Sequence, residues 1–164
     1  YQSVSRTLEK VSVSITRKNV LATHLYLSSS GSPVLTLEFK SPTTIPPGKF
    51  YILDEKGRYL YQGNIQETPP NKTLSFELFP NSYLSYNYTT STYVKDNTTY
   101  VNYTLKLVNY NTIPEPLFIS ISLPTYGRIT VKGDLPQEGH YLVKEITLAP
   151  GQEVVFRGQV IIRK

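Results

Sequence analysis

Apolar and polar residues alternate along much of this 164-residue chain, with a period of two. Val11, Val13 and Ile15, for example, are separated by single serines. Successive side chains of a β-strand point to opposite faces, so this pattern indicates strands with one buried face. It predicts ten to twelve strands, with the clearest at 11–16, 35–40, 50–53, 58–61, 74–78, 101–107, 117–123, 129–131, 141–148 and 154–162.

Helical periodicity is missing, and proline or glycine interrupts the chain at short intervals. We therefore predict an all-β fold built from immunoglobulin-like β-sandwich modules, two in number. Residues 44–48 and 147–151 each hold a Pro-Gly pair that leads into an apolar strand, which is typical either of duplicated modules or simply of a common turn. The expected division is 1–18 as an N-terminal strand, 19–80 as a first module and 81–164 as a second.

Residues 81–112 hold 7 of the 14 tyrosines and 6 of the 9 asparagines. This composition fits either a low-complexity segment or strands with tyrosine on an amphipathic surface. The alternation over 101–107 favours strands, and we expect them to be joined by a Tyr/Thr-rich loop near 88–99.

Composition excludes several kinds of site. The absence of cysteine rules out disulfides, thiolate metal sites and thiol nucleophiles, and His24 and His140 are too few for a histidine metal site. We therefore expect no metal, no cofactor and no catalytic residue, although an enzyme with an unrecognised site stays open as a rival. The net charge of +5 comes from scattered residues, which disfavours nucleic-acid binding, and no apolar run is long enough to span a membrane.

Four Asn-X-Thr sequons begin at Asn71, Asn87, Asn97 and Asn102. A sequon is the acceptor motif for N-glycosylation, and four of them within 32 residues exceed what chance provides. Only 18% of residues are charged, while serine and threonine number 33, and attached sugars would supply the missing solubility. The chain opens without a signal peptide, and together with the sequons this favours a secreted, extracellular protein numbered after a removed leader.

The N-terminal segment combines an apolar face with a face of serine and threonine, and it lacks the prolines and bulges that protect edge strands. It is either an ordinary first strand or a donor strand that joins the sheet of a neighbouring copy. If the segment is a donor strand, five apolar residues form its interface with the neighbouring copy: Val4, Leu8, Val11, Val13 and Ile15. Such a head-to-tail contact propagates into a filament when it does not close into a ring.

Several turn-and-strand motifs resemble the C-terminal β domain of the mucoidy-inhibitor-A-like proteins, a family of unknown function. They are Ile45-Pro46-Pro47-Gly48-Lys49, Tyr59-Leu60-Tyr61-Gln62-Gly63, Thr68-Pro69-Pro70 before Leu74-Ser75-Phe76-Glu77-Leu78, Tyr103–Tyr110 and Leu148–Glu153. The resemblance begins at Ile45 and covers about 70% of the whole chain. It implies a two-part β-sandwich and carries no catalytic residue.

The short β chain, its clustered sequons and its lack of cysteine are also similar in kind to glycosylated thread-filament subunits of thermoacidophilic archaea. That resemblance implies a structural subunit of a cell-surface filament, assembled with copies of itself by donor-strand complementation. The alternative is a monomeric, secreted sandwich that binds carbohydrate or a surface layer through exposed tyrosines at 83–110.

Overall fold

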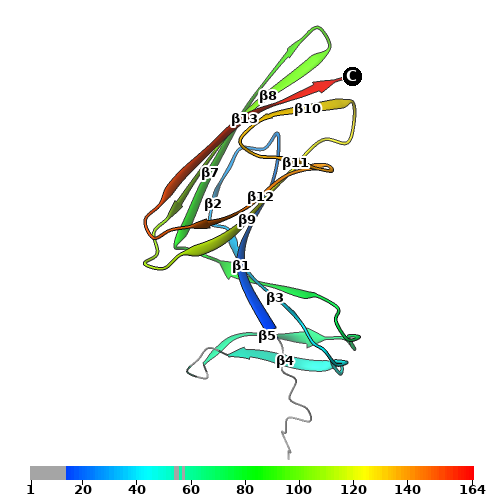
Figure 1. The fold of residues 1–164 in the computed structure, drawn as a ribbon, viewed down its shortest axis with the longest axis vertical. Coiled ribbons are helices and arrows are strands. Elements are labelled where there is room, and N and C mark those ends of the chain that lie inside the picture. The colour runs from blue at the N-terminus through cyan, green and yellow to red at the C-terminus, as the bar shows by residue number, and fades with distance from the viewer. Residues whose placement is uncertain (1–13, 54–55, 57) are drawn as a thin grey trace, which may run out of the picture. The chain divides into compact units, whose positions relative to one another are not determined.

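The computed structural model describes residues 14–53, 56 and 58–164, and over this part of the chain it is all-β, with no helix. The predicted fold class is confirmed at this level (Figure 1). The strands are β1 (Ser14–His24), β2 (Ser29–Gly31), β3 (Val34–Lys40), β4 (Gly48–Leu53), β5 (Tyr59–Ile65), β6 (Leu74–Pro80), β7 (Leu84–Lys95), β8 (Thr98–Asn109), β9 (Glu115–Ser122), β10 (Arg128–Gly133), β11 (Gln137–Glu138), β12 (Tyr141–Leu148) and β13 (Glu153–Arg163).

The described residues form three sheets. Their strand orders are β11-β12-β9-β1-β3-β6, β10-β13-β8-β7-β2 and β4-β5. The chain also divides into two compact units, whose described residues are 14–17 with 37–78, and 18–36 with 79–164. The division expected from the sequence placed residues 19–36 together with 37–80 in the first module.

Residues 18–36 belong to the second unit because β1 pairs with β9, far along the chain. The pairing is parallel and runs from Asn19 opposite Leu117 to His24 opposite Ser122. A parallel pair needs a long crossover between its strands, so nothing in the local sequence reveals it. The 90 residues from 25 to 114 separate the two strands.

The second unit is sandwich-like, with one hydrophobic core shared by two sheets. On β8 and β9, buried residues alternate with more exposed ones over almost the whole strand, as the period-two pattern predicted. Leu105 of β8 and Ile119 of β9 are both fully buried in the same cluster. Tyr88 and Tyr103 also face inward, and their hydroxyls meet backbone groups: Tyr88 donates to Leu25 O (2.7 Å), and Tyr103 accepts from Leu135 N–H (3.4 Å).

The prediction of a loop near 88–99 is wrong, because β7 and β8 form one long hairpin over these residues. Lys95 pairs with Thr98, so only Asp96 and Asn97 turn the chain. Both have positive φ, 51° and 61°, as a type I′ turn requires. Threonine and tyrosine are good strand formers, and here they extend the strands to the turn.

The first unit contains the predicted hairpin, formed by β4 and β5, which pair antiparallel from Gly48 opposite Ile65. The Phe76 ring contacts two other phenylalanines: its centroid lies 5.5 Å from that of Phe39 and 4.5 Å from that of Phe50, which belongs to the hairpin. An isolated antiparallel bridge between Ile45 and Thr68 closes the connections on either side of the hairpin.

Candidate glycan-acceptor and assembly sites

All four sequon asparagines have exposed side chains. Asn71 lies in the turn before β6 in the first unit, with a positive φ of 65°. Asn87, Asn97 and Asn102 all lie on the β7–β8 hairpin of the second unit. The acceptor residues are thus accessible to a bulky sugar, and three of them share one element.

Asn102 lies on the outer face of the five-stranded sheet, between the buried residues Val101 and Tyr103. Its Oδ1 accepts a hydrogen bond from Nε2 of Gln159, the residue opposite it on β13 (3.0 Å). Thr104, the hydroxyl residue of the sequon, lies on the same face because it is two residues further along the strand.

The other two hairpin sequons have different surroundings. Asn87 lies opposite Lys106, which forms a salt bridge of 3.2 Å with Glu153, and on its other side opposite Ser30 of β2. Asn97 is the second residue of the hairpin turn. The rings of Tyr93 and Tyr100 stack near that turn, with centroids 4.8 Å apart and an interplanar angle of 9°.

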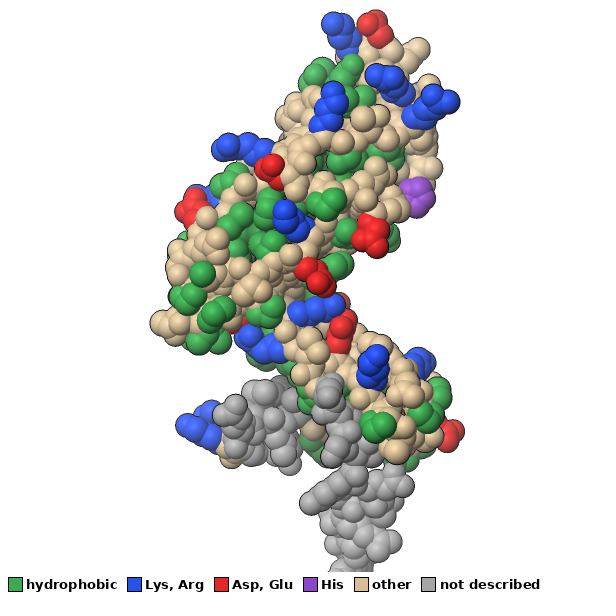
Figure 2. All heavy atoms as spheres, viewed as in Figure 1, with side chains coloured by type: hydrophobic (Ala, Val, Ile, Leu, Met, Phe, Trp, Pro, Cys, Tyr) green, Lys and Arg blue, Asp and Glu red, His purple; other side chains and the backbone are tan. Residues whose placement is uncertain are grey.

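Hydroxyl and amide side chains predominate on the outer face of this sheet. Ser91, Asn102 and Gln159 form one row across β7, β8 and β13, and Thr89, Thr104 and Arg157 form another. On the surface shown in Figure 2, charged side chains are scattered among polar and apolar ones, some of them in pairs. This distribution matches the low charge of the sequence and offers no continuous basic stripe on that surface.

Of the proposed donor-strand residues, Val4, Leu8, Val11 and Val13 lie outside the described residues. Ile15, the fifth, is on β1 and is 55% exposed. It is the one residue of the five whose exposure the structure describes, and its side chain is available for contact with another chain.

Two strands of the second unit have partly unpaired edges that adjoin the core. Pairing of β12 with β11 ends at Leu142, and pairing of β13 with β10 begins only at Gly158. Over the described residues, 144–148 and 153–156 therefore pair with a strand on one side only. Between these edges lie Lys144, Ile146, Val154 and Phe156, which we call the β12–β13 seam.

The seam is mostly apolar. Ile146 and Val154 are half-buried against the core, and Phe156 is buried with the Lys144 ammonium 5.2 Å from its ring centroid. At the end of the seam, Asn109 holds the turn between β12 and β13, because its Nδ2 donates to Leu148 O at 3.0 Å and to Ala149 O at 3.2 Å. The turn in this way fixes the spacing of the two strands.

A buried polar cluster in the second unit was not predicted from the sequence. The Glu115 carboxylate is fully buried and accepts hydrogen bonds from the side-chain amides of Asn19 (2.9 Å), Asn81 (3.3 Å) and Asn111 (2.9 Å). Asn81 also donates to Asn19 Oδ1 at 2.9 Å. The cluster ties together the middle of β1, the residue after β6 and the start of β9.

His24 and His140 are both exposed. Over the described residues, no group of three or more histidine, cysteine or acidic side chains is placed to bind a metal ion. The same part of the chain contains no helix of the length and hydrophobicity needed to cross a bilayer.

Comparisons with known proteins find no family model, no curated protein and no solved structure that matches this chain.

Proposed function

We propose that this protein is a structural subunit of an extracellular, N-glycosylated filament, assembled head to tail by donor-strand complementation. The N-terminal strand of one copy would add to a sheet of the next copy. The observation that carries the proposal is the exposed Ile15 at the start of β1, where the alternating pattern of Val11 and Val13 continues into the described part of the chain.

The β12–β13 seam is the acceptor that best fits such a donor. An added strand needs unpaired backbone groups for its hydrogen bonds and apolar positions for alternate side chains. The seam combines both, since two partly unpaired edges flank Ile146, Val154 and Phe156. Each fully buried valine or isoleucine of the donor would contribute about 1.5–3 kcal/mol.

Glycosylation is supported by the exposure of all four sequon asparagines. Three of them lie on the hairpin, where sugars would cover the outer face of the five-stranded sheet and leave the seam open. Intact-mass measurement of protein from its native host tests this: we expect masses well above the 18.6 kDa of the bare chain.

Electron microscopy of variants tests the donor strand. Full-length protein should form fibres, whereas a chain lacking residues 1–13 should stay folded and monomeric. Val13→Asp should also block assembly, because it would bury an unpaired charge in the neighbour. Ser12→Asp is the matched control, since it places the same charge on the opposite face of the same segment, and it should assemble.

A disulfide experiment tests the seam directly, because the chain has no cysteine of its own. Mixed Val13→Cys and Val154→Cys chains should form an intermolecular disulfide under mild oxidation, and Val13→Cys mixed with Arg157→Cys, outside the seam, should not. Fibres from the truncated chain would refute the donor strand. Fibres from full-length protein without the Val13–Val154 disulfide would refute only the seam as acceptor.

A second candidate function is carbohydrate or surface-layer binding by a monomer. The stacked pair of Tyr93, which is exposed, and Tyr100, which is half-buried, favours it, because aromatic faces pack against the apolar faces of sugars. A full-length chain that stays monomeric at high concentration and binds defined glycans on an array, with binding lost in Tyr93→Thr, would support this candidate over the filament.

A further inference from the structure

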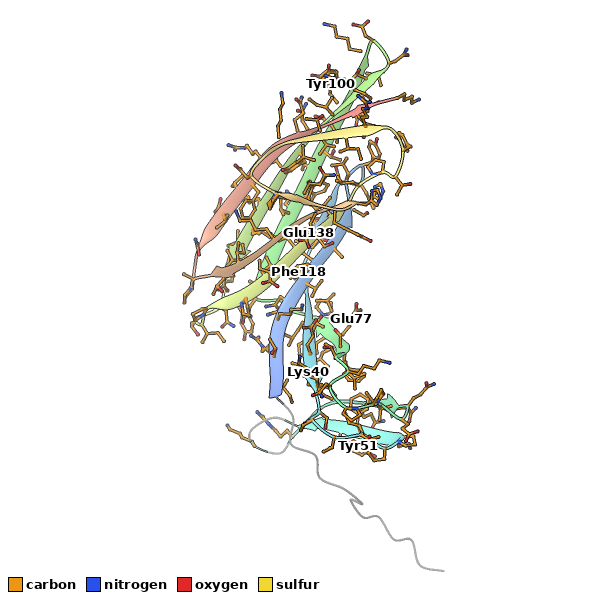
Figure 3. The ribbon with its side chains drawn as sticks, turned by 45° about the vertical axis from the view of Figure 1, so that its right-hand side comes forward. Lys40, Tyr51, Glu77, Tyr100, Phe118 and Glu138 are labelled. Atoms are coloured by element: carbon orange, nitrogen blue, oxygen red, sulfur yellow. The ribbon has the colours of Figure 1, made fainter. Side chains whose placement is uncertain are left out.

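Tyr100, Asn102 and Thr104 follow one another on the outer face of β8. Alternate residues of a strand share a face and lie about 7 Å apart, so an aromatic ring, the acceptor amide and the sequon hydroxyl form one line. Tyr100 lies near the tip of the hairpin (Figure 3), and Asn102 is the next residue on the same face toward the body of the sheet.

The Asn102 side chain is oriented by its neighbour on β13. Gln159 Nε2 donates to Asn102 Oδ1 at 3.0 Å, which holds the carbonyl oxygen of the amide on the side of β13. The amide nitrogen, which is the atom that accepts a sugar, is then directed away from Gln159. Because the side chain is exposed, that nitrogen is accessible to a transferase.

The Tyr100 ring is also held in place. It stacks on Tyr93 of the paired strand with centroids 4.8 Å apart and is half-buried, whereas Tyr93 is 48% exposed. A ring that is already ordered loses little conformational entropy when a ligand packs on it. The aromatic pair is thus a preformed surface beside the acceptor asparagine.

We propose that Tyr100 is the platform on which the first sugar linked to Asn102 packs, with Gln159 positioning the amide. This inference rests on the proposed glycosylation and adds a defined sugar-contact site to it. The C–H bonds on one face of a hexose carry partial positive charge, which complements the negative face of an aromatic ring. Packing there would order the glycan and stabilise the hairpin.

The covalent step is ordinary N-glycosylation with a lipid-linked sugar diphosphate as donor. Asn102 Nδ2 forms a bond to the anomeric carbon while the bond from that carbon to the diphosphate oxygen breaks. The lipid diphosphate leaves with the bonding electrons, and the amide proton passes to a base of the transferase. Tyr100 acts after this step, through contact alone.

Asn87 provides a comparison within the same sheet. It is an exposed sequon asparagine on the same face, yet its neighbours there are Ser85, Thr89, Ser30 and Lys106, with no aromatic ring. A sugar on Asn87 therefore has no equivalent platform. Ser85→Tyr would supply one at the spacing that Tyr100 has from Asn102.

The experiment uses full-length protein secreted from a eukaryotic host and trimmed by an endoglycosidase to one N-acetylglucosamine per site. Replacing sequon threonines by valine keeps every asparagine in place. Thr73→Val, Thr89→Val and Thr99→Val leave only the Asn102 sequon, and Thr73→Val, Thr99→Val and Thr104→Val leave only that of Asn87. Each protein is compared with the same chain, unglycosylated, from a bacterial host.

For the sugar linked to Asn102, we expect the proton resonances to shift upfield in NMR spectra and to show cross-relaxation with the Tyr100 ring. The increase in Tm caused by this sugar should exceed the increase caused by a sugar on Asn87 by about 1–6 °C, as expected for an aromatic contact in a chain of this length. Tyr100→Thr should abolish both effects, and Ser85→Tyr should create them at Asn87.

Equal spectra and equal Tm gains at the two sites would overturn the platform, as would an Asn102 that stays unmodified in a host that modifies Asn87. The proposed function fails by a different observation, namely a bare mass for the native protein or the absence of fibres. If the tyrosine pair contacts free sugars added to the solution, but not a sugar linked to Asn102, the result would instead favour the carbohydrate-binding candidate.

Discussion

Glu115 is a single residue on which three asparagines converge through their side-chain amides. Glu115→Gln should lower the free energy of unfolding by about 1–3 kcal/mol, because one carboxylate oxygen would become an amide that faces N–H donors. Unfolding in guanidinium chloride measures this change. Glu145→Gln, on the exposed face of β12, is the control and should change stability by less than about 0.5 kcal/mol.

Gly158 has no room for a side chain. A Cβ there would meet the phenol of Tyr103 and would lie 2.6 Å from the backbone oxygen of Lys132. Gly158→Ala should destabilise the protein by about 1–3 kcal/mol, measured by denaturant unfolding. If the phenol hydroxyl is the main obstacle, Tyr103→Phe should make the alanine less costly. Equal costs in both backgrounds would assign the clash to what that variant keeps, namely the Cζ ring carbon of residue 103 and the backbone of β10.

These residues also mark a limit of sequence interpretation. Asparagine and glutamate look like surface residues in a one-dimensional pattern, and only the pairing of β1 with β9 brings Asn19 and Glu115 together. The exposed asparagines are easier to predict: the alternation of Val101 with Tyr103 places Asn102 on the polar face of its strand, and its side chain is exposed there.

Among the elements, the β7–β8 hairpin depends on two residues with positive φ, Asp96 and Asn97. Asn97→Gly should preserve or raise stability, whereas Asn97→Ile should cost about 1–2 kcal/mol, because a branched side chain resists the left-handed conformation. Thermal unfolding of unglycosylated protein measures both changes without the sugar. Equal stabilities for the two variants would contradict a tight two-residue turn.

The period-two pattern predicted most strands well, including those at 101–107, 117–123, 141–148 and 154–162. It failed at the hairpin turn because Asp-Asn lacks the glycine that usually marks a type I′ turn, and the many threonines there suggested a loop. Strand order was beyond the sequence, since the alternation fixes which face a residue occupies and not which strand lies beside it. The two family resemblances stay predictions.

At the scale of the whole molecule, the burial of tyrosines makes the free energy of unfolding depend on pH in the alkaline range. Burial, together with a 3.0 Å hydrogen bond to Tyr126, raises the pKa of Tyr26 to about 12, and burial also raises the pKa of Tyr88 and of Tyr103. Unfolded tyrosine titrates near pH 10. Above that pH the folded state holds protons that the unfolded state has lost.

The contribution of these three tyrosines to the free energy of unfolding should therefore be fully present up to about pH 9 and should decrease as pH rises through 10 toward 12. Denaturant unfolding at a series of pH values measures the slope, and tyrosinate absorbance follows the titration. Tyr26→Phe should make the decrease shallower by removing one of the three groups. A free energy that stays constant to pH 11 would contradict this assignment.

The parallel alignment of β1 with β9 has a mechanical consequence. If subunits are joined through the segment before β1, tension along a filament pulls β1 lengthwise past β9. Its six paired residues, from Asn19 to His24, would then be loaded in shear, so their hydrogen bonds would have to break together rather than one after another. The topology that hides this pairing from the sequence would also make β1 a tension-bearing strand.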